Sequence, residues 1–227
     1  MADEVITIDG PAASGKSTVA QLLATRLGVS FLDTGAMYRA VTLAALKAGV
    51  DMTDEQKLLQ VMETSDFQFS VKQGKMGAYI DGVDVTEEIR QPEVTANARY
   101  VAASAKLRHK LVRMQRQVAA QEKRIVTEGR DQGTVAFPNA DIKFYLTADV
   151  GERAKRRQAE LQATGDTVNL EQVQRALEER DRSDEGRAVG PLRPAGDAVV
   201  IDTTDLSVEE VVETILRCVK EKCSKRD

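Results

Sequence analysis

The segment at residues 10–17 limits the possible folds of this chain more than any other feature. It reads G-P-A-A-S-G-K-S and fits the pattern G-x-x-x-x-G-K-[ST] at every fixed position. An apolar run at residues 5–8 precedes it and a helical pattern follows it, which is the strand-to-helix junction that this pattern requires. Small residues let such a loop turn its backbone N–H groups toward phosphate oxygens. The sequence therefore predicts a P-loop that binds a nucleoside triphosphate.

The residues of this loop have distinct expected roles. Lys16 is expected to reach the β- and γ-phosphates of ATP and is a candidate catalytic residue. Ser17 is expected to ligate Mg²⁺, the cofactor that bridges the same phosphates. The expected ATP-binding residues are Gly10, Pro11, Ala12, Ala13, Ser14, Gly15, Lys16, Ser17 and Thr18.

Strand-like runs alternate with helical patterns along most of the chain. The runs lie at residues 5–8, 30–32, 124–127, 142–146 and 198–201. This alternation predicts an α/β fold in which helices cover both faces of a parallel sheet. In such folds phosphate ligands bind beyond the carboxyl ends of the strands.

One stretch departs from the alternation. Three short runs at residues 66–71, 76–80 and 83–85, joined by turns at 72–75 and 81–82, predict an antiparallel β-meander. The length of 227 residues suits one domain with a small insertion. We therefore expect a single unit, residues 1–227, whose core comprises 1–65 and 93–227 and whose insertion spans about 66–92.

Helix starts are marked by three local signals. The capping-box patterns T-D-E-Q at residues 53–56 and S-V-E-E at 207–210 each predict a helix N-terminus. Pro92 is expected in the first turn of another helix.

Charge and hydropathy restrict the partners. The formal net charge of −4 argues against a binder of nucleic-acid polymers or anionic membranes. No apolar run approaches the roughly 20 residues of a membrane helix, and the first strand begins too early for an export signal. We expect a cytoplasmic monomer that binds small molecules.

A P-loop alone does not identify the phosphoryl acceptor. A GTPase switch should carry D-x-x-G and N-K-x-D motifs, and the chain has neither. A motor ATPase should carry an apolar strand that ends in Asp-Glu, and none of the five runs does. A small-molecule kinase is the remaining enzyme class, and it needs cations that hold the acceptor and a lid that excludes water.

Two arginine-rich segments could meet that need. Arg180, Asp184 and Arg187 are spaced i, i+4, i+7 on a predicted helix and would share one face, suited to a phosphate and a sugar hydroxyl. A helix after the fourth strand carries Arg153, Arg156 and Arg157 and is a candidate lid at about 150–166. The alternative for both segments is a solvated helix face with i, i+4 ion pairs.

The motifs together resemble those of the bacterial-type cytidylate (CMP/dCMP) kinases, within the nucleoside monophosphate kinase group. The likeness runs nearly end to end. Its motifs are I-T-I-D-G-P before the P-loop, D-T-G-A-M-Y-R at residues 33–39, E-G-R-D-Q-G-T at 128–134, A-F-P at 136–138 and R-D-x-x-D-x-x-R-A-V at 180–189.

This resemblance implies a P-loop NTPase three-layer fold with a five-stranded parallel sheet, an antiparallel nucleotide-binding insertion and a short helical lid. It implies transfer of the γ-phosphoryl group of Mg·ATP to CMP or dCMP, with ATP and CMP or dCMP as partners. Two alternatives stay open: a kinase for UMP or a non-nucleotide acceptor, and an ATP-binding switch without transfer.

The resemblance also implies roles for individual residues. The acceptor phosphate would be held by Arg39, Arg130 and Arg187, and Thr34 and Tyr38 would line the same pocket. The sugar would contact Arg180 and Asp184, and the cytosine edge would be read by Arg108 and Asp131. The expected catalytic residues are Lys16, Arg130, Arg153, Arg157 and Asp33. Asp33 or Asp131 would orient a Mg²⁺-bound water or the acceptor.

Two positions depart from the family pattern. The family often carries A-S-x-V-A with a serine that contacts cytosine, whereas residues 98–102 read A-R-Y-V-A and offer no serine for that contact. Gln132 stands where an apolar residue is usual.

Overall fold

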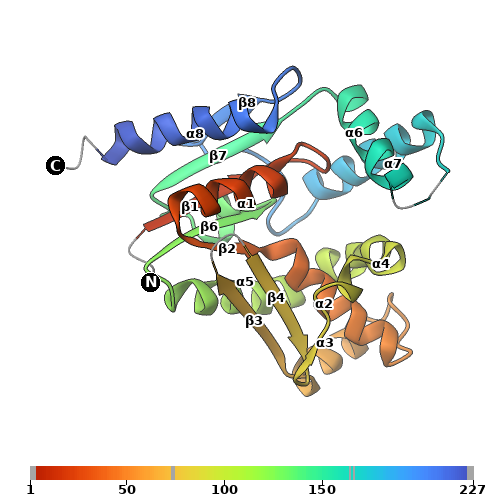
Figure 1. Ribbon diagram of the computed structural model, residues 1–227. Helices are drawn as coiled ribbons and strands as arrows, with labels where there is room; N and C mark the ends of the chain where they lie inside the picture. Colours follow the sequence, from red (N-terminus) through yellow and green to blue (C-terminus); the bar gives the residue numbers. More distant parts are fainter. Residues whose placement is uncertain (1–3, 73–74, 164, 166, 224–227) are drawn as a thin grey trace.

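The structure, a computed structural model, describes residues 4–72, 75–163, 165 and 167–223. Five strands form a parallel sheet in the order β2-β6-β1-β7-β8 (Figure 1). The strands are β1 (Glu4–Asp9), β2 (Ser30–Asp33), β6 (Arg124–Gly129), β7 (Ile142–Thr147) and β8 (Val199–Asp202). Each of the five predicted runs overlaps one of them, so the predicted parallel sheet is confirmed.

The strand register brings three acidic residues together at the carboxyl ends of the strands. Asp33 of β2 lies opposite Glu128 of β6, and Asp9 of β1 lies opposite Gly129. Strand β1 is central and buried from its second residue onward, which explains its continuous apolar run. The segments that follow β1, β2 and β6 therefore all begin at the same edge.

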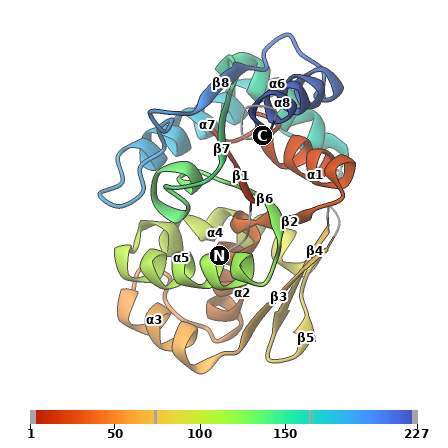
Figure 2. The same ribbon diagram turned by 90° about the vertical axis from the view of Figure 1, so that its left-hand side faces the viewer.

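Helices cover both faces of the sheet and give the predicted three layers. Figures 1 and 2 show α1 (Lys16–Leu27) beside α8 (Val208–Cys223) on one face. The other face is covered by α2 (Thr34–Lys47), α4 (Pro92–Ala103) and α5 (Ala105–Ala120), and α3 (Glu55–Thr64) packs against α2 and α5.

Two further helices stand beyond the carboxyl ends of the strands. They are α6 (Val150–Ala163) and α7 (Leu170–Glu185), which pack against each other (Figure 1). Helix α6 coincides with most of the predicted lid, of which residues 164 and 166 lie outside the described residues. None of the helices in the described ranges is long and apolar enough to cross a membrane.

A separate antiparallel sheet confirms the predicted meander. It consists of β3 (Phe67–Lys72), β4 (Lys75–Ile80) and β5 (Val83–Asp84), and η1 (Glu88–Arg90) follows it. Residues 73 and 74 of the predicted turn lie outside the described residues. The Sδ of Met76 accepts a hydrogen bond from the N–H of Asp33 at 3.2 Å, so this sheet contacts the edge strand β2.

The local signals for helix starts give a mixed outcome. Ser207 and Glu210 form the predicted capping box, and Pro92 is the first residue of α4. The box at residues 53–56 is wrong, because Asp54 is the N-cap of α3 and its carboxylate accepts from the N–H groups of residues 56 and 57. The hydroxyl of Thr53 instead donates to Asp51 at 2.8 Å.

Candidate active site

The loop between β1 and α1 has the backbone geometry of an anion site. A Cβ on Gly10 would stand 2.2 Å from the carbonyl oxygen of Leu146, so only glycine fits where the loop passes strand β7. Ala13 and Gly15 have φ values of 60° and 83°, in the left-handed region. Gly15 is the N-cap of α1 and no side chain caps this helix, so its first N–H groups are free to bind phosphate oxygens.

Lys16 lies against this loop. Its Nζ donates to the carbonyl oxygen of Pro11 at 3.1 Å, and the side chain is buried. Burial and repulsion by Arg130 lower the pKa of Lys16 to about 7, while Glu128 opposes this change. A bound triphosphate would add negative charge beside Lys16 and favour its charged form.

Ser17 and Glu128 form a hydroxyl–carboxylate pair beside the loop. The Oγ of Ser17 donates to Oε1 of Glu128 at 2.9 Å. Burial raises the pKa of Glu128, Lys16 opposes this change, and Asp33 adds to it. Hydroxyl and carboxylate oxygens suit Mg²⁺, which takes one or two protein carboxylates and completes its shell with phosphates and water. Ser17 and Glu128 together therefore fit a Mg²⁺ site. The sequence analysis predicted Ser17 as a ligand but gave Glu128 no role.

Asp33 has a positioning role that the sequence did not indicate. It is the N-cap of α2, where its Oδ1 accepts from the N–H of Ala36 at 2.8 Å and its Oδ2 pairs with Arg39 at 3.0 Å. Burial alone would raise the pKa of Asp33, but Arg39, the Ala36 N–H and Arg90 together bring it below its usual value. The Asp33 carboxylate is therefore ionised, and it holds Arg39 in place.

Four charged side chains meet beyond the carboxyl ends of the strands: Arg130 directly follows β6, Arg180 and Asp184 belong to α7, and Arg187 follows α7. Asp184 pairs with Nε of Arg130 at 2.9 Å and also with Arg187. Arg180 acts on the same carboxylate, and the three guanidiniums lower the pKa of Asp184 against the effect of burial. The predicted helix through residue 187 is wrong, because α7 ends at Glu185. Arg187 nevertheless joins the cluster from just beyond the helix end.

Arg180 combines exposure with a lowered pKa. Its side chain is exposed to solvent, yet surrounding protein atoms and Arg130 lower its pKa to about 10. Because Arg130, Arg180 and Asp184 also act on Lys16, the arginine cluster and the P-loop lie within electrostatic reach of each other.

Arg108, Asp131 and Tyr38 form a neighbouring group. Arg108 and Asp131 make a buried ion pair, and the Arg108 guanidinium lies 5.6 Å from the centre of the Tyr38 ring. The hydroxyl of Tyr38 is buried and has no hydrogen-bond partner among the described residues, and burial raises its pKa to about 12. A Cβ on Gly190 would stand 2.1 Å from Asp131, so glycine there lets the chain pass close to the pair.

The three lid arginines differ in their surroundings. Arg153 is buried, donates to the carbonyl oxygen of Ala12 in the P-loop at 3.2 Å and pairs with Asp181 of α7 at 2.6 Å. Arg156 donates to the carbonyl oxygens of residues 203 and 204. Arg157 is partly exposed and pairs with Glu160 at 2.9 Å. Of the three, Arg153 and Arg156 anchor α6, whereas the partner of Arg157 among the described residues is a neighbour on its own helix.

The buried side chain of Gln132 forms hydrogen bonds with two threonines. It begins η2 (Gln132–Ala136), one turn of π-helix directly after Asp131, and its side chain is buried. Its Oε1 accepts from Thr127 Oγ1 at 2.9 Å, and its Nε2 donates to Thr34 Oγ1 at 3.4 Å. Thr34 in turn donates to the carbonyl oxygen of Glu128 at 2.8 Å. A polar side chain suits this position because it satisfies two buried threonines.

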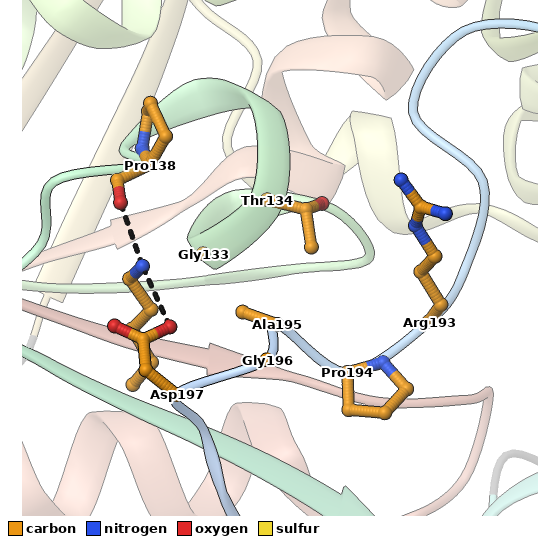
Figure 3. A pocket seen from close by; sticks show the side chains of 9 residues that line it. Gly133, Thr134, Pro138, Arg193, Pro194, Ala195, Gly196 and Asp197 are labelled. Carbon is orange, nitrogen blue, oxygen red and sulfur yellow. Dashed lines mark hydrogen bonds and ion pairs between the residues drawn. The ribbon is translucent and has the colours of Figure 1, made fainter.

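A hollow of about 440 Å³ lies between η2 and residues 193–197 (Figure 3). The Nζ of Lys143 donates to the carbonyl oxygen of Pro138 at 2.6 Å and to Asp197 at 2.9 Å. The positive charge of Lys143 is therefore already paired. None of the predicted site residues lines this hollow, so it is separate from the cluster described above.

A P-loop that faces an arginine cluster across the carboxyl edge of a five-stranded parallel sheet defines a small P-loop kinase. The cytidylate kinase family model matches residues 6–221. This chain therefore belongs to the cytidylate kinase family.

Similar proteins agree with this family. The chain is 50% identical to the cytidylate kinase of Stutzerimonas stutzeri, with 93% of each chain covered. It is 46% identical to that of Caldicellulosiruptor bescii, again with 93% of each chain covered. The crystal structure of TT1252 from Thermus thermophilus has a TM-score of 0.53 at 18% identity and 98% coverage of both chains, which shows a shared fold.

Proposed function

We infer that this chain transfers the γ-phosphoryl group of Mg·ATP to CMP or dCMP and releases ADP with CDP or dCDP. The observation that carries this inference is a pair of contacts at the end of β6: Ser17 of the P-loop donates to Glu128 at 2.9 Å, and Arg130, two residues further on, pairs with Asp184 at 2.9 Å. It supports a site in which a donor triphosphate and an acceptor phosphate lie side by side, within a chain of the cytidylate kinase family.

The chemistry needs no protein nucleophile. An oxygen of the acceptor phosphate attacks the γ-phosphorus, the bond to the β-phosphate oxygen of ATP breaks, and ADP leaves. The protein supplies alignment and positive charge in a site that excludes water. Mg²⁺, bound through Ser17 with Glu128 beside it, would neutralise charge on the bridging phosphates when present.

The acceptor side divides into three parts. Arg39, Arg130 and Arg187 hold the acceptor phosphate, and Arg180 with Asp184 contacts the sugar. Arg108 and Asp131 form the wall that reads the base, above the ring of Tyr38. The ion pairs that Asp33 and Asp184 make hold these three arginines in place.

Arg157 is the lid residue that best suits contact with the donor phosphates. It is partly exposed, whereas Arg153 is buried between the P-loop and α7. The lid at about 150–166 and the insertion at about 66–92 stay predictions, as do the monomeric state and the cytoplasmic location.

The test is an ADP-release assay with Mg·ATP in which CMP, dCMP, UMP, AMP and GMP are offered separately beside a reaction without acceptor. Turnover confined to CMP and dCMP is expected. Equal use of UMP would show relaxed base reading by the altered stretch at residues 98–102, in which the Arg99 guanidinium lies 4.8 Å from the centre of the Tyr100 ring. ADP release that does not depend on any acceptor would contradict the proposed function.

A further inference from the structure

Asp9 joins the donor loop to the acceptor segment. It is the last residue of β1, directly before Gly10, and its side chain is buried. Its Oδ1 accepts from the N–H of Gln132 and its Oδ2 from the N–H of Gly133, each at 2.8 Å. These two residues open η2 and directly follow residues 130–131 of the acceptor site. One carboxylate therefore spans the two halves of the site.

The contacts continue from η2 into the acceptor pocket. The carbonyl oxygen of Asp131 accepts hydrogen bonds from the N–H groups of Val135 and Ala136, at 2.8 and 3.1 Å. The backbone of Asp131 is therefore bonded to η2. The Gln132 side chain reaches Thr34. A shift of η2 would consequently change the orientation of both Asp131 and Thr34.

We propose that Asp9 is a positioning residue that keeps the acceptor segment aligned with the P-loop, so that ATP and the acceptor nucleotide bind cooperatively through its carboxylate. The inference rests on the proposed function. Asp9 itself touches neither reacting group: it acts on Asp131 and Arg130 through η2, and on the donor phosphates through the backbone of Gly10.

The decisive variant is Asp9→Asn, because an amide oxygen can accept from only one of the two N–H groups and the amide nitrogen would face the other. Asp141→Asn is the matched control, since Asp141 accepts from the N–H of Val5 at 2.7 Å, at the opposite end of the same strand. Both changes remove part of a carboxylate–backbone contact of β1. Asp9 contacts η2, directly after the acceptor segment, whereas Asp141 contacts the opposite end of β1.

The readout is the Kd of CMP, by calorimetry at pH 8, without and with a saturating non-hydrolysable ATP analogue. In the wild-type protein the analogue should tighten CMP binding about fivefold or more, a typical coupling between two sites. Asp9→Asn should bring this ratio to about one, and Asp141→Asn should keep the wild-type ratio. A purely structural role for Asp9 would lower the Tm of Asp9→Asn without changing the ratio, and that outcome would contradict the proposal.

The outcomes separate the two levels of inference. An active wild-type enzyme whose Asp9→Asn variant keeps the coupling ratio would overturn the role of Asp9 and leave the proposed function intact. A wild-type ratio of one would do the same. Absence of turnover with both CMP and dCMP would overturn the proposed function and this inference with it.

A second measurement requires no variant and covers the case in which Asp9→Asn fails to fold. Amide hydrogen exchange of Gln132 and Gly133 in the wild-type protein should slow when the ATP analogue binds alone, because these N–H groups bond the residue that precedes the P-loop. Unchanged exchange at both amides would contradict the proposal.

Discussion

The hydroxyl of Ser17 donates to the carboxylate of Glu128 at 2.9 Å and so joins the first turn of α1 to the end of β6. Parallel register places these residues together, since β1 and β6 are neighbours and their carboxyl ends coincide. Mg²⁺ that binds Ser17 would replace this hydrogen bond and gain a carboxylate close by.

We predict that Glu128→Gln lowers kcat about 10- to 100-fold and raises the Mg²⁺ concentration needed for half-maximal rate, as expected for loss of a group that supports a metal. Glu122→Gln is the control, because Glu122 accepts from the hydroxyl of Ser30 at 2.6 Å in a similar pair away from the site. Steady-state kinetics over a Mg²⁺ titration checks this. A Glu128→Gln enzyme with the Mg²⁺ dependence of the control would refute the role of Glu128.

We predict that Arg187→Ala raises the KM for CMP by a factor equivalent to roughly 1.5–3 kcal/mol, the usual value of a charge-assisted hydrogen bond. The KM for Mg·ATP should change little. Arg175→Ala on the exposed face of α7 is the control, since Arg175 lies 4.0 Å from Glu171 in a solvated pair. An unchanged KM for CMP in Arg187→Ala would remove Arg187 from the acceptor site.

The lid arginines should separate into two kinds. Arg153→Ala leaves Asp181 and the Ala12 carbonyl without their partner, so we predict a loss of about 3 kcal/mol in the free energy of unfolding. Arg157→Ala should lower kcat at least about tenfold with a change in unfolding free energy below about 0.5 kcal/mol. Denaturant unfolding and kinetics on both variants check this. The reverse assignment of effects would show that Arg153 is the residue acting on phosphate.

The pH dependence of stability should reveal Asp9. Burial raises its pKa to about 7 from 3.8 and Asp131 adds to this, while the two N–H groups and Arg130 oppose it. Tyr145 also faces this carboxylate. Between these pKa values the folded chain binds the proton and the unfolded chain does not. The contribution of Asp9 therefore falls as pH rises from about 4 to 7, by about 1.4 kcal/mol per pH unit.

The measurement for Asp9 is the difference in unfolding free energy between the wild-type protein and Asp9→Asn, from urea titrations at several pH values. The difference should decline from pH 4 to 7 and then level off, since asparagine does not titrate. A difference that grows with pH would show that the two backbone hydrogen bonds outweigh burial and depress the pKa.

Much of the fold could be predicted from the sequence because its signals are local. Apolar runs marked the five strands, and the glycine pattern marked the turn at residues 10–17. Local signals failed where two neighbouring residues could serve the same purpose. Asp54 caps α3 because the hydroxyl of Thr53 is already bonded to Asp51.

For the site, the sequence indicated candidate residues but not their contacts. The structure pairs Asp184 with Arg130 and Arg187, although Arg187 lies beyond the end of α7, and the roles of these residues stay predictions. The contacts of Asp9 and Glu128, on which their proposed roles depend, involve strands whose order in the sheet no single segment encodes. Their position at the carboxyl ends of neighbouring strands was the available signal, and it became specific only with the sheet order.

The most direct test of the account is to follow γ-labelled ATP in a reaction with CMP and to separate the products by chromatography. We predict that the label appears in CDP with the wild-type enzyme. Lys16→Ala should give no labelled CDP while it keeps the wild-type circular dichroism spectrum, and Lys143→Ala, which alters another buried lysine bonded to a carbonyl oxygen, should still give labelled CDP. Label that appears only as inorganic phosphate, or label in CDP at the wild-type rate with Lys16→Ala, would contradict the account.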